Sequence, residues 1–422
     1  MSATDDAHRR IEAVWRIEAP RLIAGLARML RDFGLAEEVA QDALVAALET
    51  WPINGVPERP GAWLMTTAKR RAIDQLRRDT LAARKHAQLG YEMTLLQPAG
   101  GDDVVHDDGI GDDLLRLVFT ACHPVLSADA RVALTLRVLG GLSTPEIARA
   151  FLVSEATIAQ RIVRAKRTLA EKQVPFELPR GAELAPRLAS VLEVVYLIFN
   201  EGYAATAGTD WMRPALCAQA LRLGRILASL APYEPEVYGL LALMELQASR
   251  FPARTNVHGE PVLLAAQDRA RWDAGRIRRG LAALARAEAL GGAEGPYALQ
   301  AALAACHARA GCYAATDWSR IAALYARLTR VAPSPVVELN RAVAVAMVEG
   351  AQAGLSVLDA LVDEPRLADY HLLPSVRGEL LIRLGRDDEA RAAFEQAAAL
   401  TANARERALL TQRAAACARR PS

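Results

Sequence analysis

The feature that most constrains the fold of this chain is a helical pattern along almost its whole length. Ala, Leu, Arg and Glu dominate nearly every segment, and the alternation of β-branched residues expected of strands is almost absent. Turns rich in Pro and Gly separate the helical segments. Because 422 residues exceed the size of one ordinary core, we predict an all-α protein of two to four domains.

Composition and cysteine usage indicate a protein of the cytoplasm. Apolar residues make up 52% and charged residues 24% of the chain, as in soluble globular proteins. The long apolar run at Leu188–Phe199 is interrupted by Glu193 and is too short to cross a bilayer. Residues 1–10 lack the apolar stretch of a secretion signal, and five scattered cysteines do not suit a disulfide framework. We expect no membrane partner.

The charges are distributed unevenly, although the net charge is only +2. Residues 1–86 hold fourteen Lys or Arg against twelve Asp or Glu, and residues 114–172 hold nine against four. Residues 87–113 hold seven acidic residues and no basic one, and Gly100–Asp113 is too polar and Gly-rich to pack. We therefore predict one small helical domain at 1–86, a flexible acidic linker at 87–113 and a second small helical domain at 114–175.

A helix-turn-helix is predicted at residues 142–169, LSTPEIARAFLVSEATIAQRIVRAKRTL. Ser143 or Thr144 can cap a short first helix, and Pro145 suits its first turn. A second helix begins after Ser154, and from Ile158 its apolar residues recur at helical spacing and form one buried stripe. The opposite face is basic, as in helices that enter the major groove of DNA.

The second helix of this motif carries two groups of candidate DNA contacts. The side chains expected to bind phosphates are Arg161, Arg164, Lys166 and Arg167. Those expected to contact base edges are Ser154, Glu155, Thr157 and Gln160. The alternative interpretation is a solvated basic helix without a DNA partner.

Two further segments in the N-terminal half carry surfaces suited to partners. Leu35–Trp51, LAEEVAQDALVAALETW, has an acidic face with one apolar residue, which suits docking onto a basic surface or is simply solvated. That face contains Glu38, Gln41, Asp42, Val45 and Glu49. Pro60–Arg78, PGAWLMTTAKRRAIDQLRR, combines Trp63 with a basic surface, and basic plus aromatic residues suit a separated DNA strand. That surface contains Lys69, Arg70, Arg71, Arg77 and Arg78, whereas Trp63 can instead belong to the core.

Together these two segments resemble region 2 of extracytoplasmic-function sigma factors, and residues 142–169 resemble their region 4. The resemblance covers about residues 10–172. It implies binding to core RNA polymerase through the β′ clamp helices, faced by Glu38, Gln41, Asp42 and Val45, and through the β subunit. It also implies that Trp63–Arg78 opens the −10 element of promoter DNA and that the second helix of region 4 reads the −35 element. The acidic linker would then occupy the cationic RNA-exit path.

The chain departs from that family at the turn and at the base-reading positions of region 4. Leu152 stands where the family usually has Gly, so the turn must close without a left-handed glycine or shift slightly. Ala159 and Gln160 replace the common Lys-Ser pair. The −35 preference of other members therefore cannot be transferred to this chain.

Helix pairs recur beyond residue 180. The clearest hairpin, Ser375–Leu400, turns at Leu384-Gly385, and similar turns occur at Glu349-Gly350 and Ala310-Gly311. A period of roughly 34 residues is typical of tetratricopeptide repeats. Residues 180–422 also resemble the C-terminal extension of one sigma-factor group with a tetratricopeptide-like domain. The stretches that carry this resemblance are VYLIFNEGYAA (195–205), DRARW (268–272), GPYALQAALAACHA (295–308), TDW (316–318) and SPVVELNRAVAVA (334–346).

The polar clusters of the chain predict little chemistry. Cys306-His307 with Cys312 lacks a fourth metal ligand, and the adjacent Cys122 and His123 would point about 100° apart on a helix. Asp268, Arg269, Arg271 and Trp272 suggest either a structural salt-bridge cluster or a ligand pocket. We expect no metal, no cofactor and no catalytic residue.

The function that these features predict is that of an alternative sigma factor, which binds core polymerase and directs promoter-specific initiation. Its C-terminal domain would regulate or support activity through an unknown protein or ligand. Two alternatives remain. One is a helix-turn-helix regulator with a repeat sensor that acts without polymerase, and the other is an interaction scaffold that does not depend on DNA.

Overall fold

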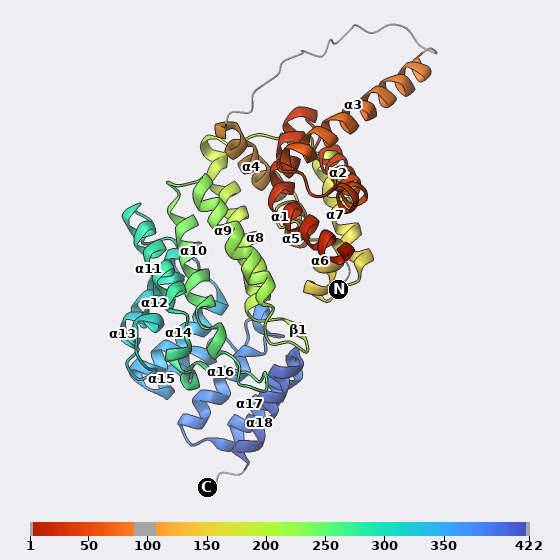
Figure 1. Cartoon of the computed structure of the whole chain (residues 1–422). Coiled ribbons are helices and arrows are strands. Elements are labelled where there is room, and N and C mark those ends of the chain that lie inside the picture. Colours follow the sequence, from red (N-terminus) through yellow and green to blue (C-terminus); the bar gives the residue numbers. More distant parts are fainter. Residues whose placement is uncertain (1–2, 88–106, 419–422) are drawn as a thin grey trace. The chain divides into compact units, whose positions relative to one another are not determined.

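The computed structural model describes residues 3–87 and 107–418. The chain divides into two compact units, residues 1–194 and 195–422, and helix α8 (Leu184–Tyr203) runs from the first unit into the second (Figure 1). Nearly all of the described elements are helices, so the predicted all-α fold is confirmed.

The first unit consists of helices that pack in two groups. Its described helices before α8 are α1 (Ala3–Leu30), α2 (Phe33–Asn54), α3 (Pro60–Ala87), α4 (Asp107–Ala121), α5 (Ala128–Val138), α6 (Thr144–Phe151), α7 (Glu155–Glu171) and the short 3-10 helix η1 (Gly181–Glu183). Helix α1 packs against α2, α3 and α4, whereas α7 packs against α5 and α6. Trp15 and Ile23 of α1 and Trp51 of α2 are buried in the first group, and Ile158 and Ile162 of α7 are buried in the second.

The prediction of a flexible linker over residues 87–113 is wrong at its end, because residues 107–113 form the first turns of helix α4. Asp113 is only 4% exposed, and its carboxylate lies 2.6 Å from Arg116 and 3.2 Å from Arg28 of α1. Acidic residues are favourable at a helix N-terminus, and the apolar residues from Leu114 onward give this helix a face to bury. The rest of the predicted linker, 88–106, lies outside the described residues.

The second unit is built from helical hairpins. Its helices after α8 are α9 (Pro214–Leu230), α10 (Pro235–Ala248), α11 (Ala274–Ala289), α12 (Pro296–Arg309), α13 (Trp318–Val331), α14 (Pro335–Glu349), α15 (Ala351–Asp359), α16 (Leu372–Arg383), α17 (Asp387–Leu400) and α18 (Ala404–Cys417). The 3-10 helices are η2 (Phe251–Ala253), η3 (Leu264–Ala266), η4 (Arg269–Arg271) and η5 (Pro365–Leu367), and β1 (Ala207–Gly208) pairs in parallel with β2 (Ala402–Asn403). Among helices in the described ranges, none is long and apolar enough to span a bilayer.

The repeat turns predicted from sequence separate paired helices in this unit. Gly385 follows α16 with φ of 71°, and Gly350 lies between α14 and α15 with φ of 95°. Both are left-handed conformations that glycine adopts without a steric penalty. Phe394 of α17 is buried against α16, and Leu355 of α15 is buried in the same cluster. Stacked hairpins that share a continuous core are the architecture of a helical-repeat domain.

Candidate polymerase and DNA interfaces

The acidic face predicted on α2 is one exposed surface of that helix. Asp32 caps the helix by accepting a hydrogen bond from the Leu35 N–H at 3.0 Å. Glu38 and Asp42 are exposed, Val45 is 48% exposed and Gln41 is partly buried. The buried side of α2 carries the predicted apolar stripe from Val39 to Trp51, and Leu35 is partly buried. The surface has the composition that docking onto a basic partner requires.

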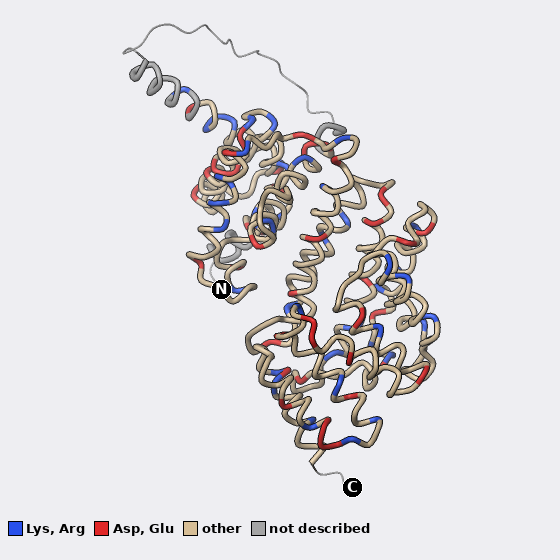
Figure 2. The backbone as a smooth tube through the Cα atoms, turned by 180° about the vertical axis from the view of Figure 1, so that it is seen from behind, with Lys and Arg blue, Asp and Glu red and all other residues tan. Residues whose placement is uncertain are grey.

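Helix α3 places the predicted basic residues along one element (Figure 2). Lys69, Arg70 and Arg77 are exposed, whereas Arg71 lies 3.6 Å from the Asp42 carboxylate of α2. The side chain of Arg78 lies outside the described residues.

Trp63 of α3 packs partly into the core of the first unit. Its ring centre lies 5.3 Å from that of Trp51 in an edge-to-face arrangement, and the side chain is partly buried. Edge-to-face contact is a stable geometry for aromatic pairs. The structure therefore favours the core interpretation of Trp63, with a minor part of the residue still reachable from solvent.

Helices α6 and α7 form the predicted helix-turn-helix with the predicted caps. Ser143 and Glu146 make a capping box, in which Glu146 accepts from the Ser143 N–H at 2.7 Å. Ser154 caps α7 by accepting from the Thr157 N–H at 3.1 Å. Leu152 closes the turn in the left-handed conformation, with φ of 52°. The turn thus uses the backbone geometry for which glycine is usually selected, without a glycine.

The candidate DNA contacts on α7 differ in exposure and in whether they form ion pairs. Glu155, Gln160 and Arg164 are exposed. Arg161 lies 2.7 Å from Asp129, and the exposed Arg167 lies 2.6 Å from Glu171. Such ion pairs near the surface contribute little energy to the fold.

Lys166 is engaged by a residue that the sequence analysis did not identify. Glu37 of α2 is only 4% exposed, accepts a hydrogen bond from Arg137 of α5 at 3.3 Å and also accepts one from Lys166. A second ion pair, at 2.7 Å, joins Arg16 of α1 to Glu146 of α6. In the sequence, Glu37 stands between the apolar residues Ala36 and Val39, which are both buried in the structure. An acidic residue on the buried side of a helix needs a basic partner, and this position could have indicated one.

The cysteines of the two clusters differ in burial. Cys122 is buried, its Sγ lies 3.3 Å from the Thr135 hydroxyl, and burial raises its pKa to about 11. A thiol with so high a pKa is a poor nucleophile at neutral pH. Cys306 is buried while Cys312 is exposed. Within the described part of the chain, no group of three or more His, Cys, Asp or Glu side chains is placed to hold a metal ion.

Three family descriptions match this chain. "Sigma-70 region 2" matches residues 15–81, "Sigma-70, region 4" matches residues 116–169, and "Family of unknown function (DUF6596)" matches residues 187–288. The first two cover the helices that carry the candidate polymerase and DNA surfaces. The fold and these surfaces define a sigma factor, the class of proteins that directs transcription initiation.

Relatives identify the group within that class. The ECF RNA polymerase sigma factor SigK of Mycobacterium ulcerans is 32% identical over 154 residues, which are 35% of this chain and 78% of that protein. SigK of Mycobacterium tuberculosis is 34% identical over 146 residues, which are 34% of this chain and 74% of that protein. An uncharacterised protein of Rhizobium meliloti is 44% identical over 395 residues, which are 93% of this chain and 92% of that protein. The chain belongs to the ECF sigma factors and is an alternative sigma factor for transcription initiation.

The solved structure of yeast Tom70 aligns with 91% of this chain and 80% of its own, at 12% sequence identity and a TM-score of 0.37, which is too low to support a shared fold. The SigK alignments span 154 and 146 residues, about a third of this chain.

Proposed function

We propose that this sigma factor binds core RNA polymerase through the exposed face of α2 and promoter DNA through α3 and α7. In this assignment region 2 lies within residues 1–86, region 4 lies within residues 114–175, and residues 180–422 regulate or support activity in the cytoplasm. Glu38, Gln41, Asp42 and Val45 contact the β′ clamp helices, region 4 contacts the β subunit, and the sigma factor uses no catalytic residue of its own.

The observation that carries the proposal is the exposure pattern of α2. The residues assigned to polymerase share one face of that helix, and its opposite face is buried. An acidic surface with a small apolar centre can gain both electrostatic attraction and apolar burial on a basic partner. For α3 and α7, exposed Lys and Arg side chains supply phosphate contacts, and Gln160 near the start of α7 supplies a base-edge contact.

The test is promoter-specific transcription with purified core polymerase. The variant Glu38→Lys reverses one charge of the docking face and should weaken polymerase binding at least tenfold. Glu12→Lys makes the same change at an exposed position of α1 and serves as the matched control. Equal binding by both variants would contradict the assignment of α2.

The same assay separates the alternatives. A helix-turn-helix regulator would bind promoter duplex tightly and specifically without polymerase, and a scaffold would show no DNA dependence. A sigma factor directs initiation only when the polymerase is present.

To test the role of the second unit, the chain must be shortened without losing the contacts that α8 makes in the first unit. Ser190 of α8 donates to the Cys122 carbonyl at 2.6 Å, and Arg131 of α5 lies 2.8 Å from Glu193. A chain that ends at residue 194 keeps these contacts. If residues 195–422 regulate or support activity, this chain should differ from the full chain in promoter-specific transcription. Identical activity of the two would sink the proposal.

A further inference from the structure

Three arginines in the second unit have only neutral hydrogen-bond partners. Arg250 donates to the side-chain oxygens of Gln247 and Gln267, each at 3.2 Å. Arg254 donates to the carbonyl oxygen of Tyr203, and Arg269 donates to the carbonyl oxygen of His307. Within residues 195–418, none of the three guanidinium groups forms an ion pair. We call Arg250, Arg254 and Arg269 the arginine cluster.

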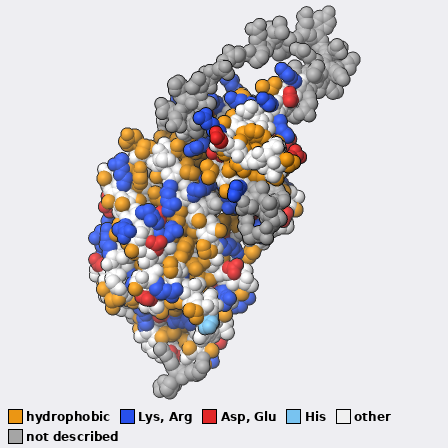
Figure 3. Space-filling model, in the orientation of Figure 1, with side chains coloured by type: hydrophobic (Ala, Val, Ile, Leu, Met, Phe, Trp, Pro, Cys, Tyr) orange, Lys and Arg blue, Asp and Glu red, His pale blue; other side chains and the backbone are white. Residues whose placement is uncertain are grey.

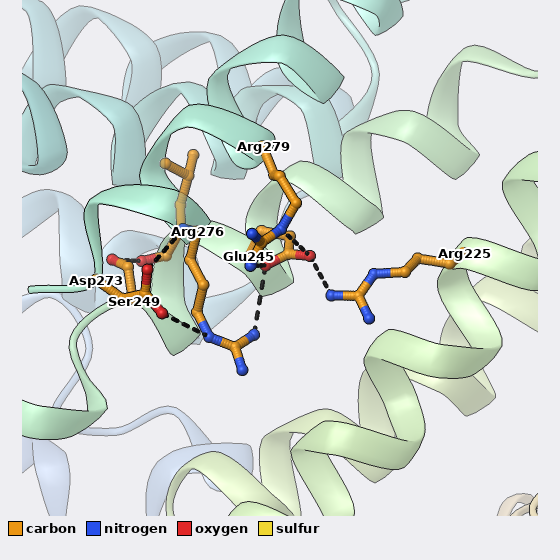
Figure 4. Close-up of polar contacts among 7 residues, drawn as sticks. Arg225, Glu245, Ser249, Asp273, Arg276 and Arg279 are labelled. Carbon is orange, nitrogen blue, oxygen red and sulfur yellow. Dashed lines mark hydrogen bonds and ion pairs between the residues drawn. The ribbon is translucent and has the colours of Figure 1, made fainter.

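Other arginines of the same unit do pair with an acidic residue. Arg225 of α9 and Arg276 and Arg279 of α11 point toward the carboxylate of Glu245 on α10 (Figure 4). Glu245 is buried, so these contacts satisfy a carboxylate in the core. The space-filling view shows further Lys and Arg side chains among hydrophobic ones over the same unit (Figure 3).

The arginine cluster carries its charge into the interior. Arg254 is only 6% exposed, and a buried charge without a counter-charge is costly. Burial lowers the pKa of Arg254 and of Arg269, and the neighbouring Arg250 lowers both further. Burial, followed by Arg250 and Arg269, also lowers the pKa of His307 to about 4, so the imidazole is neutral at pH 7. An anion among these groups would relieve repulsion that no described residue relieves.

The guanidinium groups of the arginine cluster lie over the faces of aromatic rings. The guanidinium carbon of Arg254 lies 3.7 Å from the ring centre of Tyr203, and that of Arg269 lies 4.2 Å from the ring centre of Trp272. Arg250 lies 5.5 Å from the same Trp272 ring. A guanidinium stacked on a ring keeps its N–H donors in its own plane, where they can bind an oxyanion in bidentate fashion.

Several buried donors around the cluster have no acceptor among the described residues. They are Nε and Nη2 of Arg269, Nε1 of Trp272 and Nε1 of Trp318. Trp272 is only 6% exposed. Trp318 lies 5.3 Å from the ring of His307, whose carbonyl oxygen accepts from Arg269. Since buried N–H groups are nearly always paired, the unpaired donors of these neighbouring side chains call for an acceptor.

We propose that the arginine cluster and Trp272 Nε1 bind the oxyanion group, phosphate or carboxylate, of a small molecule. The ligand is anionic because three positive charges lie together without an acidic partner. It is small because Arg254 and Trp272 are more than nine-tenths buried and leave no room for a protein segment. The sequence DRARW suggested either a salt-bridge cluster or a ligand pocket, and this proposal assigns it to the second kind of site. Asp268 caps η4 instead, by accepting from the Ala270 N–H at 2.9 Å.

The test uses the full chain and calorimetric titration with two probes, inorganic phosphate and succinate, at constant ionic strength kept with sodium chloride. At least one probe should bind saturably, and Arg250→Gln and Arg269→Gln should each weaken that binding at least tenfold. Trp272→Phe keeps the ring and removes the N–H, and should weaken binding severalfold. Arg225→Gln and Arg279→Gln are matched controls, because these arginines contact Glu245, and should bind as the native chain does.

Thermal unfolding gives a second readout that does not depend on transcription. In chloride, Arg250→Gln should unfold at the same temperature as the native chain or higher, because it removes one of three like charges. In phosphate or succinate the order should reverse, because only the native chain is stabilised by the ligand. Preference for one probe identifies the group bound. No saturable binding of either probe, equal losses in the control variants, or an unchanged order of unfolding temperatures would overturn the proposal.

Discussion

Leu152 shows how a single backbone conformation limits the stability of the DNA-binding module. Its φ of 52° is left-handed, and its side chain is 52% exposed, so packing recovers little of the strain. A non-glycine residue in this region costs about 1–2 kcal/mol. Leu152 ends α6, and the cap residue Ser154 begins α7 two residues later, so the turn between the two helices is short.

A glycine at this position should stabilise the module. Leu152→Gly is expected to raise the free energy of unfolding by about 1 kcal/mol, because glycine adopts this conformation freely. The measurement is urea unfolding of the full chain, followed by the transition of the first unit. Leu152→Ala keeps the strain and is the control. A gain for Ala as large as that for Gly would assign the effect to the lost side chain.

Glu37 is a second residue whose role depends on its contacts in the folded chain. It binds Lys166, a candidate phosphate contact, so the contact with Glu37 competes with DNA for the same ammonium group. Glu37→Ala should therefore raise the affinity of the free chain for promoter duplex severalfold at low salt, where phosphate contacts are strongest. Fluorescence anisotropy measures this, with the exposed neighbour Glu38→Ala as control. An unchanged affinity for Glu37→Ala would show that Lys166 does not contribute to DNA binding.

At the scale of the element, the repeat hairpins depend on how closely two helices approach. A Cβ atom added to Gly378 of α16 would lie 2.9 Å from the Phe394 ring of α17. Phe394 is fully buried and cannot move aside. The close packing of α16 on α17 thus depends on the missing side chain of one glycine.

Gly378→Ala should destabilise the second unit by about 1–3 kcal/mol, although alanine favours a helix more than glycine does. Gly311→Ala, at a turn position where an added Cβ meets nothing within 4 Å, is the control and should be neutral. Thermal unfolding distinguishes the two variants. A stabilised Gly378→Ala chain would mean that helix propensity outweighs the packing of Phe394.

At the scale of the whole molecule, two sigma regions and a repeat unit occur in one chain. The candidate DNA contacts of the sigma regions lie on α3 and α7. In the second unit three arginines surround one buried carboxylate, while the three of the arginine cluster lack an acid. Arginine therefore neutralises a buried carboxylate in the core, and we propose that other arginines contact phosphates of DNA or form the anion site.

Arg164, an exposed arginine of α7, should act on DNA through charge alone. Arg164→Gln is expected to weaken binding of the polymerase-bound sigma factor to all promoter sequences alike and to reduce the salt slope by about 1. Gln160→Ala should instead change the −35 preference at one position with little effect on the slope. Filter binding over a salt series, with −35 variants, measures both. A sequence-dependent effect of Arg164→Gln would make it a base contact.

The sequence alone determined the features that depend on neighbouring residues. The helix-turn-helix was predictable because Ser143, Glu146 and Ser154 act within one turn of their own helices. The hairpin turn at Gly385 was predictable for the same reason. The helical start of α4 was missed because Asp113 is satisfied by Arg28 on another helix, and a polar segment looks unstructured until such a partner is known.

Only the tertiary structure decided which charges meet. Glu37 and Lys166 are 129 residues apart, and Arg269 contacts a carbonyl 38 residues away. Burial makes such contacts strong or costly, yet burial depends on how helices pack and not on their local sequence. Short-range order follows from backbone propensity and caps, whereas the pairing of distant charges is selected by the assembled core.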